Sequence, residues 1–284
     1  MAELISGKVV SADVRSRIST ETKEFINKTG VTPALAVILV GNDPASAVYV
    51  RNKHKGCLEV GIRSIEITMT QETTEEELLA KIDELNNDSS VNGILVQLPL
   101  PKHISEERVI NRISPDKDVD AFHPINVGKI TIGNYDFLPC TPAGVMELLA
   151  YHNVAIEGKE CVVLGRSNIV GKPMALLLLA KNGTVTVCHS RTKNLSEITK
   201  RADILVVAIG KPKFVGKDMV KEGAVVVDVG INRTEDGKLC GDVNFDEVAD
   251  IASLITPVPG GVGPMTITML LNNTLIAAKK QYKA

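Results

Sequence analysis

The stretch Ala34-Leu-Ala-Val-Ile-Leu-Val40, closed by Gly41 and followed by Asn42-Asp43-Pro44, decides the fold. Its apolar run has the length and composition of a buried strand. The cap-type residues and the first-turn proline then predict a helix from about Pro44 to Glu59. A buried strand followed at once by a helix is the repeating unit of an α/β protein with a parallel sheet.

The same alternation continues along the chain. In the first half it predicts helices over 13–28, 73–86 and 105–112 and strands over 64–68 and 91–98. Residues 121–140 interrupt the pattern with several glycines and prolines, and we interpret them as the passage between two domains. In the second half we expect strands over 160–164, 184–188, 204–208 and 225–229 and helices over 142–152, 171–181, 194–200 and 265–280.

Composition and charge restrict the class of protein. The 284 residues are 44% hydrophobic and 23% charged, which is enough for a sizeable core. The formal net charge of -2, the absence of Trp and the aromatic content of 3% give no reason to expect nucleic acid or an anionic membrane as a partner. The N-terminal residues lack the pattern of a signal peptide, and no apolar run is long enough to span a bilayer.

The cysteines carry no ligand or disulfide pattern. An odd number of scattered cysteines without a Cys-x-x-Cys pair argues for reduced thiols in a cytoplasmic protein; they are Cys57, Cys140, Cys161, Cys188 and Cys240. The histidines show no metal spacing either, so we expect no metal.

Tyr49-Val-Arg-Asn-Lys53 lies on the helix that follows the first strand. Residues four apart share a helix face, so the phenol of Tyr49 and the amine of Lys53 are expected one turn apart on one side. The spacing alone fits a half-buried tyrosine beside a solvated lysine better than it fits a catalytic pair.

A glycine-rich turn, Gly165-Arg-Ser-Asn-Ile-Val-Gly171, separates a predicted strand from a predicted helix. Such a turn directs backbone N–H groups and the helix dipole at a phosphate. The spacing is neither that of a Walker A loop nor that of a strict dinucleotide fingerprint. An ordinary strand–helix turn remains the alternative.

The end of the next strand indicates which dinucleotide would bind. A strand that selects NAD tends to end in an acid, whereas this one continues as Cys188-His-Ser-Arg-Thr192. The hydroxyls and the guanidinium suit a 2′-phosphate, so NADP is favoured. Turns at Gly210 and before Ile231, and the glycine- and proline-rich loop 256–264, are further places for close approach to a ligand.

Taken together, these stretches resemble the bifunctional methylenetetrahydrofolate dehydrogenase/cyclohydrolase family almost end to end. The motifs that carry the resemblance are Tyr49–Lys53, Gly93-Ile-Leu-Val-Gln97-Leu-Pro-Leu-Pro101, Pro115-Asp-Lys-Asp-Val-Asp120, Gly165–Pro173, Cys188–Thr192 and Pro257-Val-Pro-Gly-Gly-Val-Gly-Pro264. One departure is Ala121, where the family usually has Gly.

The resemblance implies two activities. The enzyme would oxidise 5,10-methylenetetrahydrofolate with NADP⁺ and then hydrolyse the methenyl product to 10-formyltetrahydrofolate. Lys53 would be the general acid/base of the hydrolysis, with a pKa lowered by its surroundings. Tyr49 would orient its amine, Gln97 would hydrogen-bond it, and Asp120 would hold the pterin ring.

The resemblance also implies the fold and the binding residues. We expect an N-terminal α/β catalytic domain, residues 1–140, completed by the C-terminal helix at about 268–284, and a Rossmann-like NADP-binding domain, 141–267. The folate cleft would lie between them, and the protein would be a homodimer without a synthetase domain. Expected substrate-binding residues are Tyr49, Lys53, Val96, Gln97, Leu98, Asp120, Pro259, Gly260 and Gly261. Expected cofactor-binding residues are Gly165, Arg166, Ser167, Ser190, Arg191, Thr192, Gly210 and Ile231.

Three alternatives stay open on the sequence. A family member can keep only one activity, although Lys53 and Gln97 argue against loss of hydrolysis. Another NADP oxidoreductase, such as a shikimate-type dehydrogenase, would not need the motif around Gln97 or the turn that ends at Asp120. A nucleotide-binding sensor would need no paired Tyr and Lys.

Overall fold

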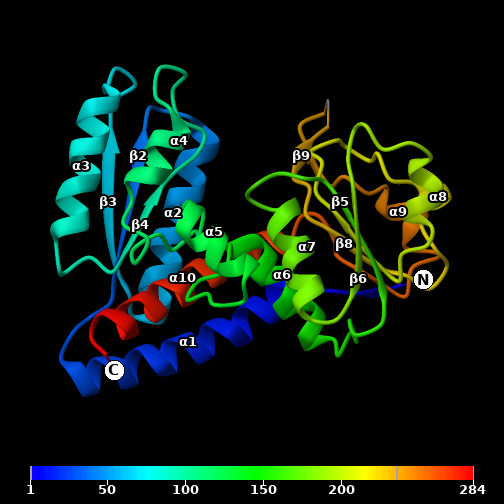
Figure 1. Cartoon of the computed structure of the whole chain (residues 1–284), viewed down its shortest axis with the longest axis horizontal. Coiled ribbons are helices and arrows are strands. Elements are labelled where there is room, and N and C mark those ends of the chain that lie inside the picture. The colour runs from blue at the N-terminus through cyan, green and yellow to red at the C-terminus, as the bar shows by residue number, and fades with distance from the viewer. Residues whose placement is uncertain (1, 235, 284) are drawn as a thin grey trace. The chain divides into compact units, whose positions relative to one another are not determined.

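The structure is a computed structural model that describes residues 2–234 and 236–283. The chain forms two compact units (Figure 1). Unit 1 contains residues 2–12 and Thr141–Thr266, and unit 2 contains Asp13–Cys140 and residues 267–283. Each unit is built on its own parallel sheet, which confirms the predicted α/β fold class.

Unit 1 carries a six-stranded sheet in which every neighbouring pair is parallel. Its order is β1 (Glu3–Leu4), β11 (Leu254–Ile255), β8 (Val225–Asp228), β7 (Ile204–Val207), β5 (Glu160–Leu164) and β6 (Thr184–Cys188). The chain runs from β5 outward to β6 and then returns past β5 to β7. That reversal of direction is where open α/β sheets bind their ligands.

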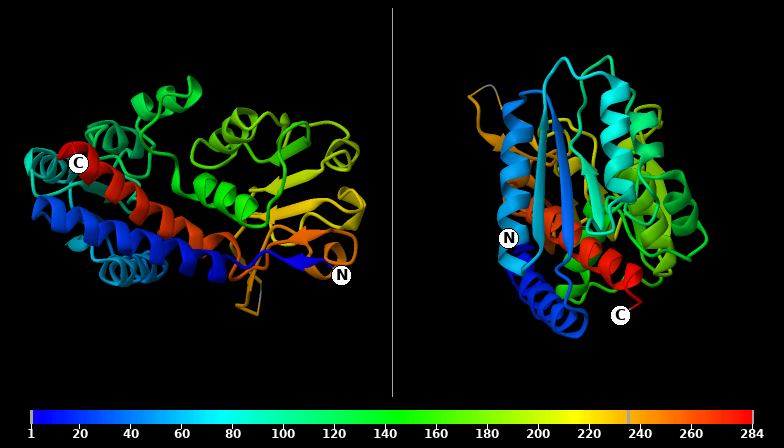
Figure 2. Two further views of the ribbon diagram at one scale, coloured as in Figure 1. Left: turned by 90° about the horizontal axis from the view of Figure 1, so that it is seen from below. Right: turned by 90° about the vertical axis from the view of Figure 1, so that its left-hand side faces the viewer.

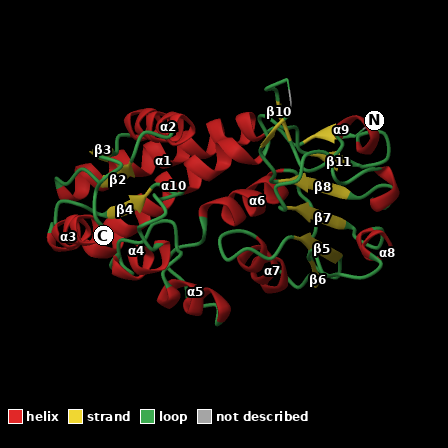
Figure 3. Ribbon diagram, turned by 90° about the horizontal axis from the view of Figure 1, so that it is seen from above, coloured by secondary structure: helices red, strands yellow, loops and turns green. Residues whose placement is uncertain are grey.

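Helices cover both faces of this sheet (Figure 3). One side is covered by α6 (Cys140–Tyr151) and α7 (Gly171–Ala180), and the other by α8 (Leu195–Thr199) and α9 (Phe245–Val248). Side chains from β5, β7 and β8 form the core beneath α8 and α9, among them Val162, Leu164, Leu205, Val207 and Val226. A short 3₁₀ helix, η1 (Lys217–Met219), and an antiparallel pair, β9 (Asn232–Arg233) and β10 (Leu239–Cys240), complete the unit.

Unit 2 carries a three-stranded parallel sheet in the order β3 (Arg63–Met69), β2 (Ala34–Val40) and β4 (Gly93–Val96). Alternate side chains of β2 pack with α3 (Glu75–Asn87) and α4 (Glu106–Arg112), while α2 (Pro44–Val60) lies on the other side (Figure 2, right). A capping box between Thr74 and Glu77 begins α3 where the sequence predicted a helix start.

Two long helices, α1 (Gly7–Thr29) and α10 (Val262–Gln281), begin in unit 1 and end in unit 2. Within unit 2 they lie side by side, since Arg15 Nε donates to Thr268 Oγ1 and Lys279 Nζ donates to Glu21 Oε2. None of the helices within the described residues is long and apolar enough to cross a membrane.

One boundary prediction was wrong, and one segment contains a helix that was not expected. Residues 2–12 were expected in the first domain, but β1 pairs with β11, so they lie in unit 1. Residues 121–140 lie in unit 2, in agreement with the predicted domain limit at residue 140. They were expected as an irregular passage between domains, but they contain helix α5 (Pro124–Thr131). His123 Nδ1 accepts from Ile125 N and Pro124 opens the first turn, which are local start signals that the glycines in this segment obscured.

The close packing of β4 against the Asp118–Asp120 turn gives a stability prediction. A Cβ on Gly93 would lie 2.7 Å from Val119 Cγ1, whereas a Cβ on Gly128 in α5 would meet nothing within 4 Å. Gly93→Ala should therefore lower the free energy of unfolding by about 1–3 kcal/mol through overpacking. Gly128→Ala should raise it by about 0.5–1 kcal/mol because alanine favours a helix. Urea unfolding of both variants checks the contrast; equal changes would contradict it.

Candidate active site

Lys53 lies on the buried side of α2 with 8% of its surface exposed. Its Nζ donates a 2.8 Å hydrogen bond to Gln97 Oε1, which confirms the predicted contact between these side chains. Gln97 directly follows β4, and its Nε2 donates to Leu98 O at 2.6 Å. The second bond fixes the amide so that its oxygen faces the lysine.

Tyr49 lies one turn before Lys53 on α2, as predicted, with 40% of its surface exposed. Its predicted role of orienting the amine finds no support, because no hydrogen bond joins the two side chains among the described residues. The lysine instead extends inward to the carboxyl end of β4, where Gln97 holds it.

Asp120 lies in the turn after Asp118 and is partly buried. The thiol of Cys140, which is fully enclosed in unit 2, lies 3.3 Å from Asp120 Oδ1 and 3.5 Å from Val119 O and donates to both. Nothing in the sequence marks this contact, because Cys140 is one of five scattered cysteines, all of which are free thiols.

Burial determines the charges in this cluster. It lowers the pKa of Lys53, while the nearby Asp120 opposes the shift. It raises the pKa of Asp120, opposed by Lys53 and by the Cys140 hydrogen bond. It also raises the pKa of Cys140 well above the ordinary thiol value, so the sulfur remains a protonated donor. A lysine in such surroundings can release its proton much closer to neutral pH than an exposed one.

The turn that presents Asp120 is held by buried side chains. Asp118, only 3% exposed, accepts from His123 N and Asn126 Nδ2, both at 2.8 Å. Lys117 Nζ donates to the carbonyls of Leu85 and Asp88 at the end of α3. Lys117 and Asp118 therefore hold the backbone of the turn in place. This role could not be recognised from the sequence, where both lie in an Asp- and Lys-rich stretch.

Unit 1 has a pocket of about 250 Å³ at the carboxyl ends of β5, β6 and β7. It contains the predicted cofactor residues Gly165, Arg166 and Ser190. Sequence reasoning missed its other lining residues, among them His189, Leu195, Ile209, Lys211 and Phe214. Lys211 Nζ lies 5.2 Å from the centre of the Phe214 ring, so a cation and an apolar face meet in one pocket.

The loop after β5 needs glycines at 165 and 171, because other backbone atoms lie where a Cβ would be. Gly165 has φ +130, and a Cβ there would lie 2.2 Å from Ala208 O. A Cβ on Gly171 would lie 2.3 Å from Gly165 O. Such a tight turn, open to a pocket on one side, fits a dinucleotide phosphate.

The backbone N–H groups of the loop after β5 were expected to point at a phosphate, but two of them bind a side chain of the loop instead. The backbone N–H groups of Val170 and Gly171 donate to Ser167 Oγ at 3.2 and 3.3 Å, so the hydroxyl caps the helix start. Thr192 Oγ1 likewise accepts from His189 N at 2.8 Å and closes the turn after β6. Ser190 and Arg191, between them, are exposed.

Two buried carboxylates shape the loops after β7 and β8. Asp242, with no exposed surface, accepts from the backbone N–H groups of Ile209, Gly210 and Lys211 at 2.7–3.0 Å. Asp228 accepts from Gly230 N, Asp242 N and Val243 N, yet burial raises its pKa to about 6. The predicted turn at Gly210 is therefore fixed by an internal anion.

The loop Pro259-Gly260-Gly261 packs against the start of α1. Lys8 N donates to Gly260 O, and a Cβ on Gly7 would lie 1.6 Å from Gly261 O. Ile231, half exposed, lies beside the same loop, because a Cβ on Gly263 would be 3.7 Å from its Cδ1. Unit 1 thus brings Ile231, expected at the cofactor, close to the segment that holds residues 259–261, expected at the substrate, while Val96 and Leu98 flank Gln97 in unit 2.

Comparison with known families identifies the chain. Residues 5–120 match the catalytic domain of tetrahydrofolate dehydrogenase/cyclohydrolase, and residues 139–282 match its NAD(P)-binding domain. The chain belongs to the tetrahydrofolate dehydrogenase/cyclohydrolase family.

Its relatives cover its whole length. The bifunctional protein FolD of Acetivibrio thermocellus is 62% identical over 282 residues, which are 99% of each chain. The crystal structure of FolD from Campylobacter jejuni is 52% identical, covers 99% of each chain and superposes with a TM-score of 0.96. FolD of Trypanosoma brucei, solved with NADP and an inhibitor, is 39% identical, covers 100% of this chain and 99% of its own, and gives a TM-score of 0.95.

Membership of the tetrahydrofolate dehydrogenase/cyclohydrolase family confirms the predicted enzyme class, its two activities in folate one-carbon metabolism and its nicotinamide cofactor. It also sets aside the shikimate-type dehydrogenase and the sensor as alternatives.

Ala121, where the resemblance led us to expect Gly, adopts a backbone conformation that suits glycine. It is fully buried and has φ 57, the left-handed region that side chains with a Cβ avoid. Its N–H donates to Asp118 O at 3.0 Å, which closes the turn. This chain therefore carries backbone strain beside Asp120.

Ala121→Gly should leave the free energy of unfolding within about 0.5 kcal/mol of the parent, because relief of about 1–2 kcal/mol of strain offsets the lost methyl contact and the added chain entropy. Ala143→Gly, in helix α6 where no strain is relieved, should cost about 1–2 kcal/mol. Thermal and urea unfolding of both variants measure the difference, and an equal loss would contradict strain at Ala121.

Proposed function

We propose that Lys53 is the general acid/base of the cyclohydrolase step. The observation that carries this proposal is the buried amine held 2.8 Å from Gln97 Oε1. Because Gln97 accepts without a charge, it fixes the amine without stabilising the ammonium form as a carboxylate would. Burial lowers the pKa of Lys53, which brings the amine closer to the range in which a general base accepts a proton near neutral pH.

In this proposal, water adds to the methenyl carbon and Lys53 accepts a proton from it. The bond between that carbon and one ring nitrogen then breaks, and this nitrogen takes up the proton that Lys53 accepted. The hydroxyl on the carbon loses its own proton to become the formyl oxygen, the formyl group stays on the other nitrogen, and one proton is released overall. No net oxidation occurs in this step. Asp120 would accept hydrogen bonds from the pterin ring, and Tyr49, half exposed one turn from the lysine, would lie along it.

We propose that unit 1 binds NADP, which accepts a hydride in the dehydrogenase step when it is bound. The tight Gly165–Gly171 turn and the adjoining pocket support this assignment. Arg166 and Ser190 would contact the phosphates, and the exposed Arg191 would pair with the 2′-phosphate. Ile231 and residues 259–261 would border the nicotinamide.

We also infer a homodimer in the cytoplasm. The inference follows from the family resemblance and from the five unpaired cysteines, which suit a reducing compartment.

Lys53→Met should lower cyclohydrolase activity at least about 100-fold, because methionine fills the space but has no proton to exchange. NADP⁺ affinity should be unchanged. Lys55→Met, an exposed lysine on the same helix, is the matched control and should keep both activities. Methenyl hydrolysis, measured by absorbance, checks this; a normal rate in Lys53→Met would remove the lysine from the mechanism.

Arg191→Ala should raise the Kd for NADP⁺ roughly 10- to 100-fold, since a charge-assisted contact with the 2′-phosphate is lost. The Kd for NAD⁺ should change little. Arg201→Ala, an exposed arginine just after α8, serves as the control. Binding titrations with the two nucleotides decide the matter, and a similar loss for both would contradict the assignment.

A further inference from the structure

Asn273 is a buried polar residue on α10, with 2% of its surface exposed. Its Nδ2 group donates to two main-chain carbonyls of unit 2, Val119 O and Leu138 O, both at 2.8 Å. The same nitrogen lies 3.8 Å from Cys140 Sγ. One side-chain amide therefore joins two segments that are distant from it in the sequence.

Both segments carry a member of the candidate catalytic cluster. Val119 directly precedes Asp120, and Leu138 lies two residues before Cys140, whose thiol donates to Asp120. A shift of either carbonyl would move Asp120 or its thiol donor. Asn273 itself touches neither the lysine nor the carboxylate, so its influence on them is indirect.

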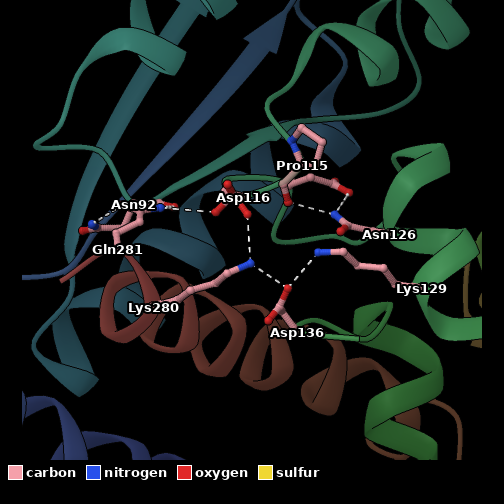
Figure 4. Close-up of polar contacts among 9 residues, drawn as sticks. Asn92, Pro115, Asp116, Asn126, Lys129, Asp136, Lys280 and Gln281 are labelled. Atoms are coloured by element: carbon pink, nitrogen blue, oxygen red, sulfur yellow. Dashed lines mark hydrogen bonds and ion pairs between the residues drawn. The ribbon is translucent and has the colours of Figure 1, made fainter. Parts of the chain in front are cut away.

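The end of α10 holds the beginning of the same turn (Figure 4). Lys280 Nζ lies between Asp116 Oδ1 at 2.9 Å and Asp136 Oδ2 at 2.7 Å. Gln281 Nε2 donates to Asp116 O at 3.2 Å and to Asn92 O at 3.0 Å. These contacts are at or near the surface, where ion pairs contribute little. Asn273, by contrast, is buried, and it binds the carbonyl of Val119, the residue directly before Asp120.

We infer that Asn273 is a positioning residue for Asp120, and that α10 in this way sets the affinity of unit 2 for folate. The inference rests on the proposed role of Asp120 toward the pterin ring. An asparagine amide has two N–H donors in one plane, one for each carbonyl. Without them, two buried carbonyls lose their partner and the turn relaxes to find others.

The test is steady-state kinetics of Asn273→Leu, which keeps the branching and the number of side-chain heavy atoms but removes both donors. The KM for methylenetetrahydrofolate should rise roughly 10- to 100-fold, because the Asp120 carboxylate would be displaced by up to about 1 Å. The Kd for NADP⁺, which is bound by unit 1, should stay unchanged. If Asn273→Leu does not fold, Asn273→Ser, which keeps one hydroxyl donor, should show a smaller rise in the same KM.

Thr274→Val is the matched control. Thr274 is fully buried on the same helix, and its hydroxyl donates only within the helix, to Leu270 O. This variant should lose stability but keep the KM for folate. If Thr274→Val raises that KM as much as Asn273→Leu does, or if Asn273→Leu only lowers the active fraction with its KM unchanged, the positioning role is overturned.

Asp120→Asn separates this inference from the proposed function. If Asp120→Asn weakens folate binding but Asn273→Leu does not, positioning by Asn273 fails while the role of Asp120 stands. If Asp120→Asn leaves folate binding unchanged, the role of Asp120 fails, and the inference falls with it.

Discussion

Burial of the Lys53 amine is the constraint on which the chemistry of unit 2 depends. An ammonium loses hydration when it is enclosed, so the fold favours the neutral amine. The partner at 2.8 Å is an amide oxygen, which orders the amine without neutralising a positive charge. Asp120 acts in the opposite sense, because its charge, when present, raises the pKa of the lysine. The position of Asp120 therefore affects the protonation of Lys53.

That position is determined largely by contacts distant in sequence. Hydrogen bonds from His123 and Asn126 hold the turn around Asp118 locally. The position of the turn relative to β4 and Cys140 is determined by packing against Gly93 and by hydrogen bonds from α10. The left-handed Ala121 indicates that this geometry is imposed by its surroundings, since a residue with a Cβ does not favour that conformation. Strain of this kind persists only where neighbouring contacts hold the backbone in place.

Local signals explain what could be predicted from the sequence. Strands 34–40, 160–164 and 184–188 and the helix start at Pro44 were predicted at their observed bounds, because apolar runs and capping residues act over a few positions. The pairing of β1 with β11 could not be predicted, since each strand has two residues and they lie about 250 positions apart. The contacts of Cys140 and Asn273 were missed for the same reason: nothing adjacent in the sequence marks them. The Lys53–Gln97 contact was accessible only through the family motifs that contain both residues.

The loops of unit 1 show how a binding turn can be fixed before any ligand arrives. Ser167, Thr192 and Asp242 take up backbone donors that a phosphate could otherwise have used. The exposed side chains of Arg166, Ser190 and Arg191 remain available in the same loops. Side chains discriminate between a ribose hydroxyl and a phosphate more sharply than backbone amides, because a guanidinium carries a full charge and a planar set of donors. The residues proposed for the choice of dinucleotide and for proton transfer lie in different compact units, so under this proposal a substitution would alter one without altering the chemistry of the other.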